Sequence, residues 1–266
     1  MIPTDPMSTT GQSSARLNVT IASVLVAAAA IAWVSVYYLM SMGGMMVTGA
    51  MVGMFVTPDI HSLLIFLLIW IVGMAAMMFP AMIPMTSIYN ATFAKSTPRS
   101  ILGSSLFLTG YLAMYLLLGV VAYLAVLLTI TMVSTMPFLW NYGTLAVGLV
   151  LVATGLWQLT PFKNACLKNC ISPLGFFLSH SRQGYGGALR MGAEHGYYCV
   201  GCCYLYMLVM FVVAGMSLPA MALLAIMITF EKALLKGARW FNWLISAVFI
   251  ILGLVVWIFP SSLMIL

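Results

Sequence analysis

The chain alternates between long apolar stretches and short polar connections, and the apolar stretches determine the expected fold. Crossing the hydrocarbon core of a bilayer takes about 20 apolar residues. Only Ser217, Leu218 and Pro219 separate the fifth and sixth stretches, but proline suits the first turn of a new helix. We therefore expect an all-α polytopic membrane protein, a bundle of about seven transmembrane helices. The expected spans are 19–42, 60–88, 101–132, 138–160, 190–216, 217–232 and 240–260.

Two features modify this simple pattern. Pro80 and Pro84 lie inside the second span, where each removes a backbone donor and clashes with the preceding turn, so we expect that helix to be kinked or broken. The first 18 residues are polar and lack the compact basic region and cleavage site of a signal peptide. We interpret 1–18 as a disordered cytoplasmic tail and 19–266 as a single transmembrane domain.

The positive charges provide a test of the span count and an orientation. The connections 43–59, 133–137 and 217–219 contain no lysine or arginine, so all ten basic residues fall on one side of the predicted topology. The positive-inside rule makes that side cytoplasmic. The sequence therefore predicts a protein of the cell membrane (inner or plasma) with its N-terminus in the cytoplasm and its C-terminus outside.

Composition narrows the class of protein. The chain is 64% hydrophobic and only 5% charged, whereas a soluble domain is about a quarter charged. The lipid bilayer is thus the expected partner, and nucleic-acid binding is not expected because the basic residues are needed at the membrane interface. No phosphate-binding glycine loop, Ser–His–Asp set or pair of catalytic carboxylates is present, which argues against an enzyme. Five clustered cysteines also argue against a disulfide scaffold.

The stretch EHGYYCVGCC, residues 194–203, concentrates groups that bind soft metals. His195, Cys199 and Cys203 are spaced by four, and Cys202 lies three beyond Cys199, so they share one helix face, which Met207 extends. Imidazole, thiolate and thioether together suit Cu(I) or Zn(II). Thiol–disulfide chemistry is the alternative, although adjacent cysteines on a helix diverge by about 100°. Cysteine can also act simply as a small apolar residue between helices.

A second cysteine pair follows the fourth span. Cys166 and Cys170 are four residues apart in PFKNACLKNC, on the same predicted side of the membrane as Cys199. The spacing alone is a weak signal. Together with His195 the two groups of cysteines can complete one four-coordinate site or form two sites that exchange a metal. They can also be incidental loop thiols.

Methionine forms a third candidate group. Met74, Met78 and Met82 recur every four residues in the second span, Met85 follows, and Met77 lies beside the stripe. Such a stripe can carry a soft metal or can be ordinary core. The methionine-rich connection 41–55 lies on the outer side, where it can capture copper or can consist of the frayed ends of two helices.

Two carboxylates lie close to these groups. Glu231 ends the sixth span, and we favour a structural ion pair with Lys232 or Arg190. Glu194 adjoins His195 and can orient the imidazole ring by accepting a hydrogen bond from it. The alternative is that Glu194 is solvated.

These motifs resemble a family of predicted metal-binding integral membrane proteins, a domain of unknown function with an HGxYCxGCC motif. The resemblance covers about residues 65–240, and Tyr204 and Ser217 stand where members often have Trp and Asn. It rests on WxxGMAAMMFPAMIPM (70–85), GYLAMY (110–115), LWQLTPFKNACLKNC (156–170), GAEHGYYCVGCCYLYM (192–207) and GMSLPAMALLAIMITFEK (215–232). The resemblance implies metal-ligand roles for His195, Cys166, Cys170, Cys199, Cys202, Cys203 and the methionines of the second span.

The sequence therefore predicts a metal-binding membrane protein that handles copper as Cu(I), either as a conduit or by delivery to another protein. Zinc and an iron–sulfur centre are the alternative metals. The alternative functions are a membrane thiol-redox protein and an accessory subunit of a larger membrane enzyme complex. Such a complex and a metal chaperone are the candidate protein partners.

Overall fold

The computed structural model describes residues 6–42, 57–92, 100–136, 138, 142–215, 217–235 and 238–259, and within these ranges it contains helices and turns but no strand. The all-α expectation is confirmed. The elements are α1 (Pro6–Met42), α3 (Ile60–Thr92), α4 (Ser100–Thr135), α5 (Gly143–Gln158), α6 (Pro161–Ile171), α7 (Pro173–His180), α8 (Gly184–Val212), α9 (Leu218–Thr229), the π-helix η3 (Phe230–Leu234) and α10 (Arg239–Ile258).

The number of helices able to cross a membrane differs from the seven that the sequence predicts. Within the described residues, five stretches are long and apolar enough, namely Val19–Leu39, Ile60–Thr92, Leu102–Thr135, Gly184–Val212 and Arg239–Ile258. A sixth results if α5 and α6, which meet at a bend of 65°, form one broken span. The prediction of seven is too high by this measure because α5 has 16 residues and α9 only 12.

Three boundaries differ from the expected ones. Helix α1 begins at Pro6, so residues 6–18 of the expected tail are helical. Helix α3 runs through Pro80 and Pro84 as one helix, so the prolines do not break it, and the expected kink at these prolines stays a prediction. The connection before α8, expected as a loop, contains α6 and α7. The methionine-rich segment 41–55 lies outside the described residues beyond Met42.

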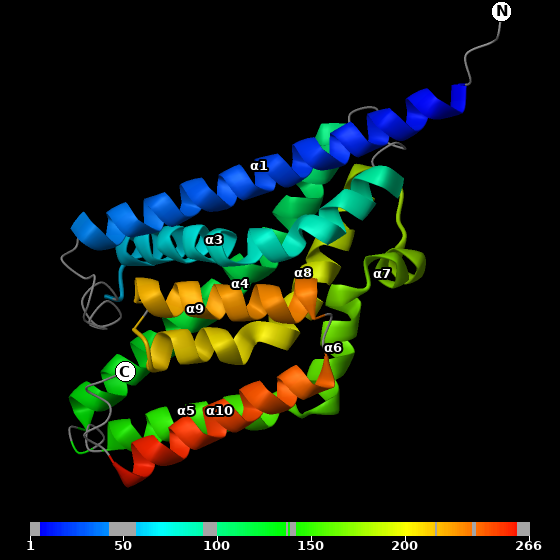
Figure 1. Ribbon diagram of the computed structural model, residues 1–266. Helices are drawn as coiled ribbons and strands as arrows, with labels where there is room; N and C mark the ends of the chain where they lie inside the picture. Colours follow the sequence, from blue (N-terminus) through cyan, green and yellow to red (C-terminus); the bar gives the residue numbers. More distant parts are fainter. Residues whose placement is uncertain are drawn as a thin grey trace, which may run out of the picture.

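The helices pack in pairs (Figure 1). Helix α1 lies along α3 on one side of the bundle, and α5 pairs with α10 on the opposite side. Helix α4 crosses α8, and α9 packs against α3. Helices α6 and α7 lie together at one end, where α6 contacts α8 and η3. Helix α6 therefore brings residues from the middle of the chain against α8 and η3, which come later in the sequence.

Glycine allows α4 and α8 to approach closely. A Cβ atom on Gly192 of α8 would lie 1.9 Å from the carbonyl oxygen of Phe107, and one on Gly110 of α4 would lie 2.1 Å from that of Leu189. Small residues at such crossings let helix backbones come into contact in membrane proteins. This close crossing brings the next turn of α4 against the cysteine-bearing turn of α8.

Candidate metal centre

Helix α8 carries five of the predicted ligands on its buried face. His195, Cys199, Cys202, Cys203 and Met207 are each 1–2% exposed. The helix begins at Gly184 rather than at residue 190, so the motif lies well within the helix and not at its first turn. The cysteines are therefore part of the interior of the bundle.

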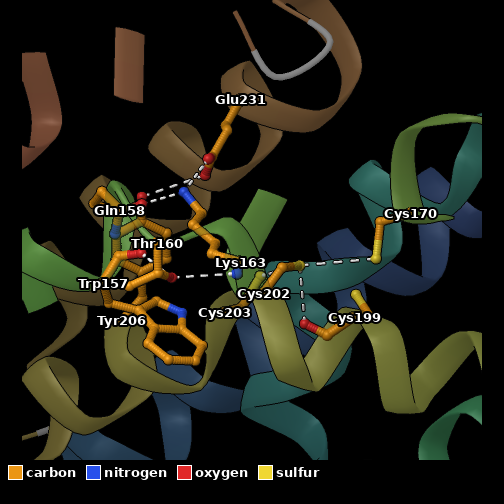
Figure 2. Close-up of polar contacts among 10 residues, drawn as sticks. All are labelled: Trp157, Gln158, Thr160, Lys163, Cys170, Cys199, Cys202, Cys203, Tyr206 and Glu231. Atoms are coloured by element: carbon orange, nitrogen blue, oxygen red, sulfur yellow. Dashed lines mark hydrogen bonds and ion pairs between the residues drawn. The ribbon is translucent and has the colours of Figure 1, made fainter. Parts of the chain in front are cut away.

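Helix α6 adds a sulfur from outside α8. The Thr160 side chain accepts a hydrogen bond from the Lys163 amide at the start of this helix, and Pro161 occupies its first turn. The helix places Cys170 Sγ 3.7 Å from Cys202 Sγ, which in turn lies 3.4 Å from Cys203 Sγ (Figure 2). The folded chain thus brings sulfur atoms from two helices together.

Cys199 completes this group and faces polar atoms from two further elements. Its carbonyl oxygen accepts a hydrogen bond of 3.1 Å from Cys202 Sγ. Its sulfur accepts a hydrogen bond of 2.8 Å from Lys232 Nζ of η3 and lies 3.2 Å from the Tyr111 hydroxyl of α4. The Tyr111 hydroxyl donates to that of Tyr115 at 3.3 Å. We call Cys170, Cys199, Cys202 and Cys203 the cysteine cluster.

Cys166 is buried but stands apart from this cluster. Its sulfur faces the backbone of α8 at Gly201, where an added Cβ atom would lie 2.9 Å away. Within the described part of the chain it makes no hydrogen bond to another cysteine. The structure therefore separates the two members of the predicted CxxxC pair.

His195 is enclosed by aromatic rings. Its ring centroid lies 5.4 Å from that of Phe176, 5.8 Å from Tyr111 and 6.2 Å from Phe107. Its Nδ1 atom is buried and has no hydrogen-bond partner. Glu194 does not orient this ring, because its carboxylate pairs with Arg190 at 3.1 Å and with an arginine of the preceding connection.

The predicted methionine stripe is fully buried and belongs to the same core as the cysteines. Its members are at most 2% exposed: Met74, Met77, Met78, Met82 and Met85. Besides Met207, the same core contains the buried methionines Met191, Met210 and Met221. Helical spacing along α8 selects two of them, because Met191 lies four residues before His195 and Met210 lies three beyond Met207, whereas Met221 comes from α9.

A second buried polar group lies beside the cysteine cluster (Figure 2). The Lys163 ammonium of α6 donates hydrogen bonds to the side-chain oxygens of Gln158 and Glu231. It also lies 5.4 Å from the centroid of the Tyr206 ring. The Tyr206 hydroxyl donates to Glu231 at 3.3 Å. The sequence predicted that Glu231 pairs with Lys232 or Arg190, and this is wrong: its partner is Lys163. The prediction missed Lys163 because the α6 region was expected to be a loop.

The short helices α6 and α7 were not predicted from the sequence, and neither was the location of Tyr111 and Lys232 at the site. Helices α6 and α7 each begin with a Thr-Pro or Ser-Pro pair, at residues 160–161 and 172–173, which is a recognised start signal. Tyr111 and Lys232 carry no such signal, since their place beside Cys199 depends on how α4 and η3 pack.

These donors fit a soft ion better than a hard one. The described residues contain no group of three or more His, Cys, Asp or Glu side chains arranged to hold a metal ion. Yet the cysteine cluster offers adjacent thiols, and the residues around it add buried thioethers and an imidazole nitrogen without a partner; these are the donors that Cu(I) prefers.

Comparison with known proteins identifies the family. Residues 67–256, more than half of the chain, match the family PpoB2, described as a copper chaperone. The chain therefore belongs to this family, and a copper-handling role is supported. No curated protein and no solved structure matches the chain.

Proposed function

We propose that the chain binds Cu(I) as cargo at the cysteine cluster and passes it to another protein. The observation that carries this proposal is the contact between sulfurs of two helices, Cys170 on α6 with Cys202 on α8, next to Cys203. Thiolates are soft ligands with high affinity for Cu(I). A pair of neighbouring thiols presented from separate helices can close on one ion.

The surroundings of the cluster favour copper in its reduced state. Buried methionine thioethers, including Met74, Met78 and Met207, share the core with the thiols and exclude water from it. His195 adds an imidazole nitrogen without a hydrogen-bond partner on the same face of α8. The methionines of α3 and His195 are candidate transient ligands along the path to and from the thiols.

Cys170 is the natural point of exchange with a partner. It is partly exposed, whereas Cys199, Cys202 and Cys203 are 1–2% exposed. A partner thiol can thus reach an ion at Cys170 first, and ligand exchange can proceed one sulfur at a time. Cys166 is not required for this exchange, because its sulfur faces Gly201.

The location that accompanies this function is the cell membrane. The five long apolar helices are compatible with it. Four basic residues belong to α6, the start of α8 and the connection between them: Lys163, Lys168, Arg182 and Arg190. Arg239, the first residue of α10, lines the same cavity as Asn164 of α6. We infer from this one-sided charge that the α6–α7 end faces the cytoplasm, where thiols stay reduced.

Thiol–disulfide exchange is the second candidate function. The distance of 3.7 Å between the sulfurs of Cys170 and Cys202 favours it, since a modest movement of α6 would bring them to bonding distance. This reading predicts a disulfide that forms under mild oxidation and is independent of copper.

Metal loading of the purified chain distinguishes these functions. The chain is extracted in mild detergent, loaded with Cu(I) under reducing conditions, desalted and analysed for metals by mass spectrometry. We expect about one copper per wild-type chain, its loss in Cys202→Ser and its retention in the matched control Cys166→Ser. Copper retained equally in both variants would refute the cysteine cluster as the site.

A further inference from the structure

Lys232 is a buried cation next to the cysteine cluster. Its side chain is only 7% exposed, and its Nζ donates to Cys199 Sγ at 2.8 Å. An unbalanced charge in an apolar interior is costly. Its location therefore requires an anion nearby.

No described carboxylate supplies that anion. The chain has only four Asp and Glu residues. Glu231, the neighbour of Lys232 in the sequence, turns to Lys163 instead, and Glu194 pairs with two arginines. Asp59 accepts hydrogen bonds at the start of α3. Asp5 lies outside the described residues. Among the described residues, Lys232 therefore faces sulfur as its source of negative charge.

We propose that Lys232 is the counter-cation of an anionic copper(I)–thiolate centre and limits that centre to two thiolates. The inference rests on the proposed function. Cu(I) carries one positive charge, so with two thiolates the centre carries one negative charge, which Lys232 neutralises. A third thiolate would leave a net negative charge in the interior, at a large desolvation cost.

The same charge balance selects between metals. A divalent ion on the same two thiolates forms a neutral centre, and the Lys232 ammonium is then left without an anion. Because Lys163 and Glu231 already neutralise one another, they do not change this balance. Lys232 therefore favours a monovalent over a divalent ion at this ligand pair.

Two adjacent residues of the π-helix η3 reach two different buried groups. In η3, Glu231 reaches Lys163 and Tyr206 while Lys232 reaches Cys199. Short π-helical turns are rare and occur frequently at functional sites. Here the turn directs opposite charges to neighbouring buried groups.

The test is a competition titration with a colorimetric Cu(I) chelator on the full chain in detergent, repeated with Zn(II) and a zinc chelator. Lys232→Met should weaken Cu(I) binding at least tenfold, about 1.4 kcal/mol. It should weaken Zn(II) binding less or not at all. Lys232→Arg, which keeps the charge, should stay within about threefold of wild type. The matched control is Lys168→Met, because Lys168 is an exposed lysine of α6.

The outcomes separate this inference from the proposed function. Wild-type chain that binds no Cu(I) overturns both. Wild-type binding that survives Lys232→Met unchanged, or a variant that loses Cu(I) and Zn(II) to the same extent, overturns the counter-cation alone. If Lys232→Met does not fold, Lys232→Gln carries the same expectation, since it keeps a hydrogen-bond donor without the charge.

Discussion

The buried ion pair between Lys163 of α6 and Glu231 of η3 should contribute strongly to holding α6 against the rest of the bundle. Both side chains are essentially unexposed, at 0% and 1%. Replacing Glu231 by Gln keeps the shape but leaves the Lys163 ammonium buried beside neutral groups. Removing one partner of a buried pair costs about 3–5 kcal/mol, because the other charge stays uncompensated. We expect Glu231→Gln to destabilise the fold by that amount, a decrease in Tm on the order of 10 °C.

The double variant Lys163→Met/Glu231→Gln tests the origin of this loss. With both charges removed, no uncompensated ion remains, so most of the stability should return. Tryptophan fluorescence during heating in detergent measures Tm for the wild type, the two single variants and the double variant. A double variant that is as unstable as the sum of the single variants would refute the reasoning, as would an unchanged Glu231→Gln.

Three further predictions follow from the packing. Gly192→Ala places a methyl group 1.9 Å from the Phe107 carbonyl oxygen and should lower the free energy of unfolding by about 1–3 kcal/mol. The control Gly186→Ala should not, because no atom lies within 4 Å of the added Cβ. Equal Tm values for the two variants would contradict this. Tyr111→Phe removes one hydroxyl contact to Cys199, so copper should stay at one per chain with affinity changed by less than about tenfold; loss of copper would make the tyrosine a ligand. The Ser62 amide and the Thr57 hydroxyl donate hydrogen bonds to the Asp59 carboxylate and hold its pKa below its usual range. These hydrogen bonds therefore stabilise the start of α3 above pH about 4, and this stabilisation is lost as the pH falls. The protection of the first-turn amides of α3 against hydrogen exchange, measured relative to their intrinsic exchange rates at each pH, should therefore fall in acid in the wild type but not in Asp59→Ala; identical pH dependence would exclude the cap.

The long helices and the buried face of α8 were predictable because both depend on local spacing. Apolar length alone locates α3, α4 and α10. The four-residue spacing of His195, Cys199 and Cys203 identifies the face that the structure buries. Residue chemistry also pointed to copper, which the family match supports.

The rest depends on contacts that spacing cannot show. Cys170 meets Cys202 across 32 residues, and Lys163 meets Glu231 across 68, because α6 turns away from α5 at a bend of 65°. Helix α6 is short and polar, so a search for membrane spans treats it as a loop. The span count was too high because the expected sixth span, 217–232, is apolar but shorter than the about 20 residues that a crossing takes, and the structure makes α9 shorter still.

Copper K-edge X-ray absorption on the loaded chain tests the central claim most directly, because it identifies the atoms bound to the ion. For wild type we expect Cu(I) with a sulfur-dominated first shell, and for Cys202→Ser loss of the copper or of sulfur from that shell. A first shell of nitrogen and oxygen alone, or identical spectra from the two proteins, would contradict copper binding at the cysteine cluster.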